Sequence, residues 1–100
     1  MVDQNHVEYL MRGNLIYVAR LVQRYVRESG KKCFTYRGLR AFWSKNKLYK
    51  ESEWHTIERK IRKMCERGLL KRIVVKKGFV VFCPTQLFWD CLYALDMLKS

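Results

Sequence analysis

The sequence contains few residues that interrupt regular structure, with one proline and five glycines among 100 residues. It has no Gly/Ser-rich linker, low-complexity segment or internal repeat, and its length leaves no room for a second hydrophobic core. No stretch approaches the roughly 18 apolar residues of a membrane span. Asp3, Glu8 and Arg12 interrupt the N-terminal segment, so the apolar run of a signal peptide is also missing. We therefore expect one ordered cytoplasmic domain without membrane contact.

Groups typical of catalytic and metal sites are missing as well. The two histidines, His6 and His55, lie far apart, and none of the four cysteines forms a C-x-x-C pair. There is no Gly-rich phosphate loop and no nucleophile elbow, and the nine acidic residues are scattered. The sequence therefore predicts a protein that is not an enzyme and binds no metal or other cofactor. It also gives no sign of a small-molecule ligand.

Positive charge is concentrated in the middle of the chain. Residues 1–30 carry four arginines and three acids, a net charge of +1, and residues 81–100 carry one lysine and two aspartates, a net charge of −1. Residues 31–80 carry sixteen lysines and arginines against four acids, which accounts for the whole net charge of +12. A basic block between two near-neutral, apolar ends indicates a binding face for nucleic acid. A merely solvated run of charge is the alternative interpretation.

Hydrophobic periodicity and capping residues predict four helices and one hairpin, an α+β chain. The helices are expected over residues 14–28, 36–44, 52–67 and 86–99, with caps at Asn14, Thr35, Ser52 and Thr85. Residues 31–34 are expected to be extended. The β-branched runs 69–75 and 79–83 flank Lys76-Lys77-Gly78, which is typical of a hairpin turn.

The third predicted helix has two chemically distinct faces. At 100° per residue, one stripe contains Trp54, Ile57, Ile61 and Met64, which we expect to face the core. The opposite face carries polar and charged side chains: Ser52, His55, Thr56, Arg59, Lys63 and Glu66. Tyr36, Trp43, Tyr49 and Trp54 interleave with the basic residues, where they could stack on unpaired bases, but packing in the core is the favoured role.

The run from Phe34 to Thr85 resembles the winged helix-turn-helix family, and Ile57 to Arg72, IERKIRKMCERGLLKR, carries the resemblance best. It looks like the end of a recognition helix followed by the phrase glutamate, any residue, glycine, leucine that leads into the wing. The lysine-, arginine- and aromatic-rich style is similar to small transcription regulators of archaea and archaeal viruses, which implies a host-cell cytoplasm if the protein is viral. The resemblance implies a winged-helix core over residues 14–83, containing the basic DNA-binding segment 31–80, and an additional C-terminal helix over residues 84–100.

The resemblance also implies roles for individual side chains. The third helix would enter the major groove and read base edges through Ser52, His55, Thr56 and Arg59. Arg59 is the strongest of these candidates, and its alternative is a surface arginine paired with Glu58 or Glu66. The wing, residues 69–83, would meet the backbone or the minor groove. Phosphate contacts are expected from Arg37, Arg40, Lys45, Lys47, Lys50, Lys63, Lys76 and Lys77.

In a winged helix the short first strand pairs with the second wing strand, so the resemblance brings Cys33 towards Cys83. A disulfide between them is one interpretation, suited to a disulfide-tolerant thermophile, as is an intersubunit bridge through Cys91. Buried free thiols are the default in a cytosolic protein.

The sequence therefore predicts a sequence-specific regulator of transcription that binds duplex DNA. Because 49% of residues are hydrophobic and 14% are aromatic, a compact monomer leaves apolar surface uncovered, and we expect a homodimer through the terminal helices 14–28 and 86–99. Two alternatives remain open. One is an architectural or RNA-binding winged helix without sequence preference, and the other is a protein-interaction module that uses the fold as a scaffold.

Overall fold

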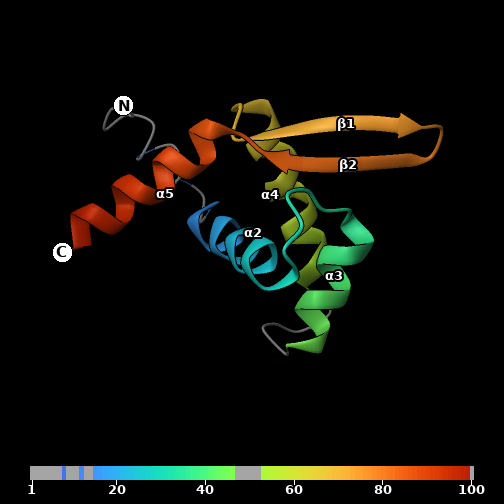
Figure 1. The fold of residues 1–100 in the computed structure, drawn as a ribbon, viewed down its shortest axis with the longest axis horizontal. Coiled ribbons are helices and arrows are strands. Elements are labelled where there is room, and N and C mark those ends of the chain that lie inside the picture. Colours follow the sequence, from blue (N-terminus) through green and yellow to red (C-terminus); the bar gives the residue numbers. More distant parts are fainter. Residues whose placement is uncertain (1–7, 9–11, 13–14, 47–52, 100) are drawn as a thin grey trace.

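The structure is a computed structural model that describes residues 8, 12, 15–46 and 53–99 (Figure 1). Its elements follow the order α2 (Leu15–Ser29), α3 (Tyr36–Lys45), α4 (Trp54–Glu66), β1 (Leu70–Lys76), β2 (Phe79–Pro84) and α5 (Gln86–Lys99). The predicted α+β class is confirmed, and the order is compatible with a winged helix. No helix among the described residues is long and apolar enough to cross a membrane.

Helix α2 lies at the centre of the core, because its apolar residues recur at helical spacing on one side. Val18, Ala19 and Val22 are fully buried, and Leu15 and Tyr25 extend the stripe. In all, twenty buried residues, contributed by every helix and by the hairpin, form one cluster. Helix α2 ends one residue later than predicted, at Ser29, and the predicted cap Asn14 lies outside the described residues.

Helix α3 begins at its predicted cap. The Thr35 hydroxyl accepts a hydrogen bond from the Gly38 N–H at 3.0 Å, which satisfies one of the unpaired donors of the first turn. Gly38 also allows a close approach of α2, because an added Cβ would lie 3.2 Å from the Tyr25 hydroxyl. Helices α2 and α3 therefore pack closely at this point.

Helix α4 ends in a Schellman motif, which explains the glycine and leucine of its last turn. The Leu69 N–H donates to the Met64 carbonyl at 2.9 Å, and the Gly68 N–H donates to the Cys65 carbonyl at 3.1 Å. Gly68 has a φ of 78°, in the left-handed region that side-chain-bearing residues rarely adopt. Leu69 is then buried, so the chain turns into the hairpin with an apolar anchor on the core.

Strands β1 and β2 form an antiparallel hairpin that projects away from the helices (Figure 1). The register pairs Leu70 with Pro84 and Val74 with Val80, and an irregularity follows Val74. The prediction for Lys76 was wrong in detail, because Lys76 pairs with Phe79 and belongs to β1 rather than to the turn. The bulge adds one residue to β1, so the turn shortens to Lys77 and Gly78.

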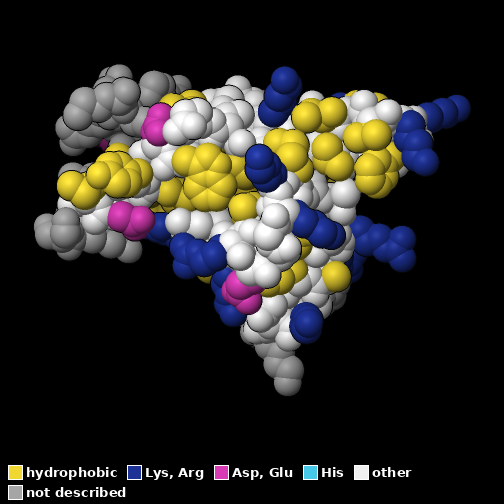
Figure 2. Space-filling model, viewed as in Figure 1, with side chains coloured by type: hydrophobic (Ala, Val, Ile, Leu, Met, Phe, Trp, Pro, Cys, Tyr) yellow, Lys and Arg dark blue, Asp and Glu magenta, His cyan; other side chains and the backbone are white. Residues whose placement is uncertain are grey.

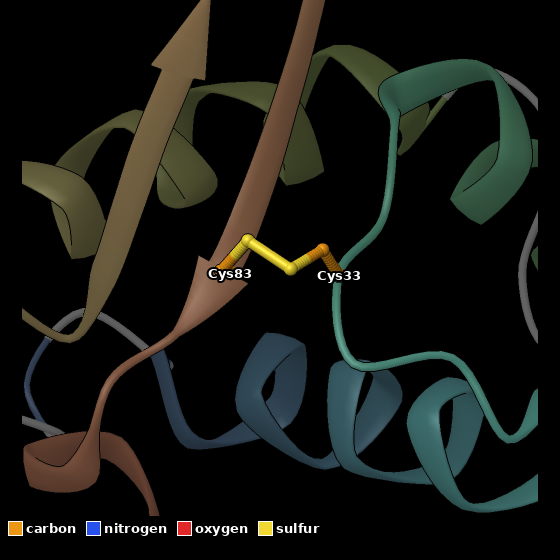
Figure 3. Close-up of a disulfide and its surroundings, with 2 residues drawn as sticks. All are labelled: Cys33 and Cys83. Atoms are coloured by element: carbon orange, nitrogen blue, oxygen red, sulfur yellow. A yellow bond between two sulfur atoms is a disulfide. The ribbon is translucent and has the colours of Figure 1, made fainter. Parts of the chain in front are cut away.

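The segment before α3 is held to β2 by hydrogen bonds and by a covalent bond. Phe34 and Phe82 exchange two backbone hydrogen bonds of 2.8 Å and form an isolated antiparallel bridge. Next to this bridge, Cys33 and Cys83 lie opposite each other and form a disulfide (Figure 3). The pairing implied by the family resemblance is therefore present. Cys65 and Cys91 are free thiols.

Helix α5 lies at the end of the molecule opposite the hairpin tip (Figure 1). Thr85 caps it as predicted, since its hydroxyl accepts from the Phe88 N–H at 3.4 Å while donating to the Gly68 carbonyl at 2.7 Å. One stripe of α5 enters the core through Phe88, Leu92 and Leu95. A second apolar side of the helix is not part of this contact.

Candidate nucleic-acid interface

Helix α4 presents the two faces that its sequence predicts. Trp54, Ile57, Ile61 and Met64 are buried in the core. His55, Thr56, Arg59 and Lys63 are all exposed on the other side. Three of the four predicted base-reading residues therefore lie on one accessible helix face, and the fourth, Ser52, lies outside the described residues. The helix begins at Trp54 after Glu53, whose side chain makes no capping hydrogen bond.

Arg59 is not held by an acidic neighbour. Its guanidinium donates to the Thr56 hydroxyl at 3.4 Å, one turn earlier on the helix. Glu58 instead lies 3.7 Å from the imidazole of His55, which is 91% exposed. Within the described residues Arg59 makes no ion pair, so its side chain is available to a partner.

A shallow basic hollow of about 260 Å³ lies along this face of α4. Thr56, Arg59 and Lys63 from the predicted set line it. Three cations that were not in that set also line it, and these are Arg12, Lys60 and Arg67. Among the residues that the structure describes, no acidic side chain lines the hollow, and five cationic side chains do. Such a surface attracts a polyanion strongly, because like charges held together reinforce the local potential.

Arg12, Lys60 and Arg67 were not among the predicted site residues. A pattern in the sequence could have placed two of them on this face, but not the third. Lys60 and Arg67 lie four and eleven residues after Thr56, so helical spacing alone places all three on one side of α4. Arg12 precedes α2 in the chain, and no local pattern relates it to α4. Only the tertiary structure brings it to the hollow.

The predicted phosphate contacts on α3 are exposed but dispersed. Arg37 is in the first turn, next to the hairpin, whereas Lys45 is the last residue, at the far end of the helix (Figure 1). The sequence had placed Lys45 in the turn after this helix. That prediction was wrong, because Lys45 belongs to α3. The Arg40 guanidinium lies 5.9 Å from the centre of the Trp54 ring, in cation–π range. Lys47 and Lys50 lie outside the described residues.

The hairpin combines a cationic tip with apolar sides. Lys76 and Lys77 are exposed where the strands meet the turn, and Figure 2 shows lysine and arginine side chains at this free end. Behind them, Val74, Val75 and Phe79 are exposed large hydrophobic residues. The tip thus has charges suited to phosphate contact, and the strands offer apolar surface.

Comparison with protein-family models, curated proteins and solved structures finds no significant match for this chain.

Trp43, Trp54 and Tyr36, three of the aromatic residues that interleave with the basic residues, pack in or against the core, as favoured from the sequence. Trp43 and Trp54 are buried, with ring centres 5.7 Å apart. Tyr36 is partly buried, and its ring centre lies 4.6 Å from that of Phe82. Tyr49 lies outside the described residues. The buried rings of Trp43 and Trp54 are unavailable for stacking on bases.

Proposed function

We propose that this chain is a winged helix-turn-helix protein that binds duplex DNA sequence-specifically and regulates transcription. The observation that carries the proposal is the basic hollow along α4, whose described lining residues include five cations and one hydroxyl but no acid. A helix of 13 residues with a polar, exposed outer face has the form required to enter a major groove. The proposal is a binding function and not an enzymatic one.

The chemistry of each side chain determines whether we assign it to base contacts or to phosphate contacts. Arg59 can donate two hydrogen bonds to one guanine edge, and Thr56 and His55 can donate to or accept from other bases. The remaining cations act on phosphates: Arg12, Arg37, Arg40, Lys45, Lys60, Lys63, Arg67, Lys76 and Lys77. These phosphate contacts supply affinity but carry no sequence information.

We further propose that the protein acts as a homodimer through α5. The apolar stripe of α2 is already buried in the protomer's own core. Helix α2 therefore has less exposed apolar surface for a dimer interface than the sequence predicts. On α5, Tyr93 is 68% exposed and Met97 is 58% exposed, and Trp89 is partly buried one turn before Tyr93. Paired recognition helices would lie about 34 Å apart and read a palindromic site.

A protein that binds DNA is expected in the cytoplasm of a prokaryotic cell. The Cys33–Cys83 disulfide requires that this cytoplasm does not reduce it. Intracellular disulfides are rare in mesophiles but common in hyperthermophiles. The proposal therefore places the protein in an organism whose cytoplasm tolerates disulfides.

Selection of binding sites from a random duplex pool at fixed, near-physiological salt tests the proposal directly. A regulator will enrich one sequence, whereas an architectural protein will enrich none. A titration of duplex affinity against salt adds the electrostatic measure. If six to eight of the nine proposed cations contact phosphates at the same time, the slope of log affinity on log salt will be about −5 to −7. A slope near zero, or the absence of duplex binding, would reject DNA as the partner and favour a protein-interaction module.

A further inference from the structure

A second, larger hollow of about 820 Å³ lies between the start of α3, the second half of α4 and the hairpin. Its volume is within the range of roughly 300–1,000 Å³ that is usual for small-molecule sites. The residues that determine its chemistry come from all three elements: Tyr36, Arg37, Arg62, Cys65, Arg72 and Phe79. No local pattern in the sequence indicates this site, because its contributors are spread over more than forty residues of chain.

The walls of this hollow are aromatic and aliphatic. Phe82 is buried at its base, and the ring of Tyr36 is tilted against it at 4.6 Å. Phe79 and Val80 line the side formed by the hairpin. The Phe34–Phe82 bridge and the adjacent disulfide hold β2 against the segment that leads into α3, so the aromatic floor is preformed. A flat apolar group would be desolvated here with little rearrangement.

The charges around the hollow favour an anion. Among its described lining residues are three arginines, Arg37, Arg62 and Arg72, and one acid, Glu66. None of the three guanidinium groups makes an ion pair within the part of the chain that the structure describes. Burial raises the pKa of Tyr36 and that of Cys65, so neither group adds a negative charge near neutral pH. The hollow thus has a net positive charge above an apolar floor.

We propose that this hollow binds a small organic anion, an acid with a flat aromatic or aliphatic body. Its acidic group would lie among Arg37, Arg62 and Arg72, where guanidinium groups bind carboxylates and sulfonates well. Its body would pack on Tyr36, Phe79 and Phe82. A nucleic-acid backbone fits less well, because phosphodiesters gain nothing from an aromatic floor. The occupant contacts α4 and the hairpin at once, so it regulates DNA affinity, a consequence that rests on the proposed function.

The fluorescent acid 8-anilinonaphthalene-1-sulfonate is a suitable probe, because it joins an aromatic body to one sulfonate. N-phenyl-1-naphthylamine, which has the same body without the sulfonate, is the matched neutral probe. We expect saturable binding of the acid at one site per chain and much weaker binding of the neutral amine. Arg62→Gln and Arg72→Gln will each weaken binding of the acid about fivefold to tenfold. Arg27→Gln, which removes one exposed charge from α2, is the control and will leave the affinity unchanged.

Equal affinities across all four proteins, or equal binding of the two probes, would overturn the proposal. Loss of duplex affinity in Arg62→Gln and Arg72→Gln without any change in probe binding would also overturn it, by assigning the hollow to the nucleic-acid backbone. The probe titrations need no DNA. If the chain proves not to bind duplex DNA, the proposed function fails while the binding site for the acid is still decided.

Discussion

Phe34 and Phe82 are joined by two mutual backbone hydrogen bonds of 2.8 Å, and their rings stack at 5.5 Å. They are 48 residues apart in the chain, so this single bridge connects the segment before α3 to the hairpin. The disulfide between the flanking Cys33 and Cys83 secures the same junction. The position of the hairpin relative to α3 and α4 therefore depends on this small area.

Reduction of the disulfide is expected to lower the free energy of unfolding by about 3–4 kcal/mol. The cysteines are 50 residues apart, and a cross-link over that separation removes considerable entropy from the unfolded chain. The Phe34–Phe82 bridge remains, so the reduced protein stays folded. Urea denaturation with and without reductant measures the difference. The Cys33→Ser/Cys83→Ser variant is the control, and reductant must leave its midpoint unchanged. Alkylation of all four cysteines without reductant would contradict the prediction.

Replacing Arg59 with alanine will reduce discrimination between bases more than it reduces overall affinity. Its guanidinium is exposed, and its hydrogen bond to Thr56 is long. We therefore expect the substitution to cost about 1–3 kcal/mol of discrimination at one base position. Affinities for the selected duplex and for its single-base variants measure this effect. Lys63→Ala, on the same face, is the comparison and will weaken all duplexes alike. Uniform weakening by both substitutions would argue against base reading by Arg59.

The tip of the hairpin should contribute two phosphate contacts. In the Lys76→Ala/Lys77→Ala variant, the slope of log affinity on log salt will become shallower by about 2. The Lys31→Ala/Lys32→Ala variant removes the same charge from exposed positions outside the proposed contacts, and its slope will match that of the wild type. Equal changes in both variants would mean that only net charge matters and that the tip has no defined contact.

Placing a charge on the outer side of α5 will dissociate the proposed dimer. Tyr93→Asp alters a side chain that is 68% exposed in the protomer, so stability of the fold should change little while an apolar interface is disrupted. Sedimentation equilibrium gives the association constant. Val75→Asp, at an exposed apolar position on the hairpin, tests whether any added charge has this effect. A wild-type protein that is monomeric at high concentration would remove the basis for the prediction.

Gly68→Ala will destabilise the fold by about 1–2 kcal/mol, because its φ of 78° is unfavourable for a residue with a Cβ. The nearest atom to the added methyl group is 4.0 Å away, so the cost comes from the backbone and not from a clash. Thermal or urea denaturation measures it. Arg27→Ala, an exposed substitution within α2, is the control for a change without backbone strain. A stability equal to that of the wild type would reject the Schellman geometry.

Local patterns in the sequence predicted the elements well, because helix periodicity and caps depend on near neighbours. The stripe of Trp54, Ile57 and Ile61 follows from 100° spacing, and the Thr35 and Thr85 caps follow from hydroxyls placed before apolar runs. The errors lie at boundaries. Lys76 was assigned to the turn, because a bulge that adds one residue to a strand leaves no clear mark in the sequence.

The sequence by itself determined that α4 has one apolar and one basic face, and that Arg59 lies at the centre of the latter. This result needs only the repeat of a single helix. Only the tertiary structure decided that Arg12 joins that face, and that Arg37, Arg62 and Arg72 share a hollow with aromatic walls. Contacts between distant segments depend on how the whole core packs, and no local pattern of residues encodes that packing.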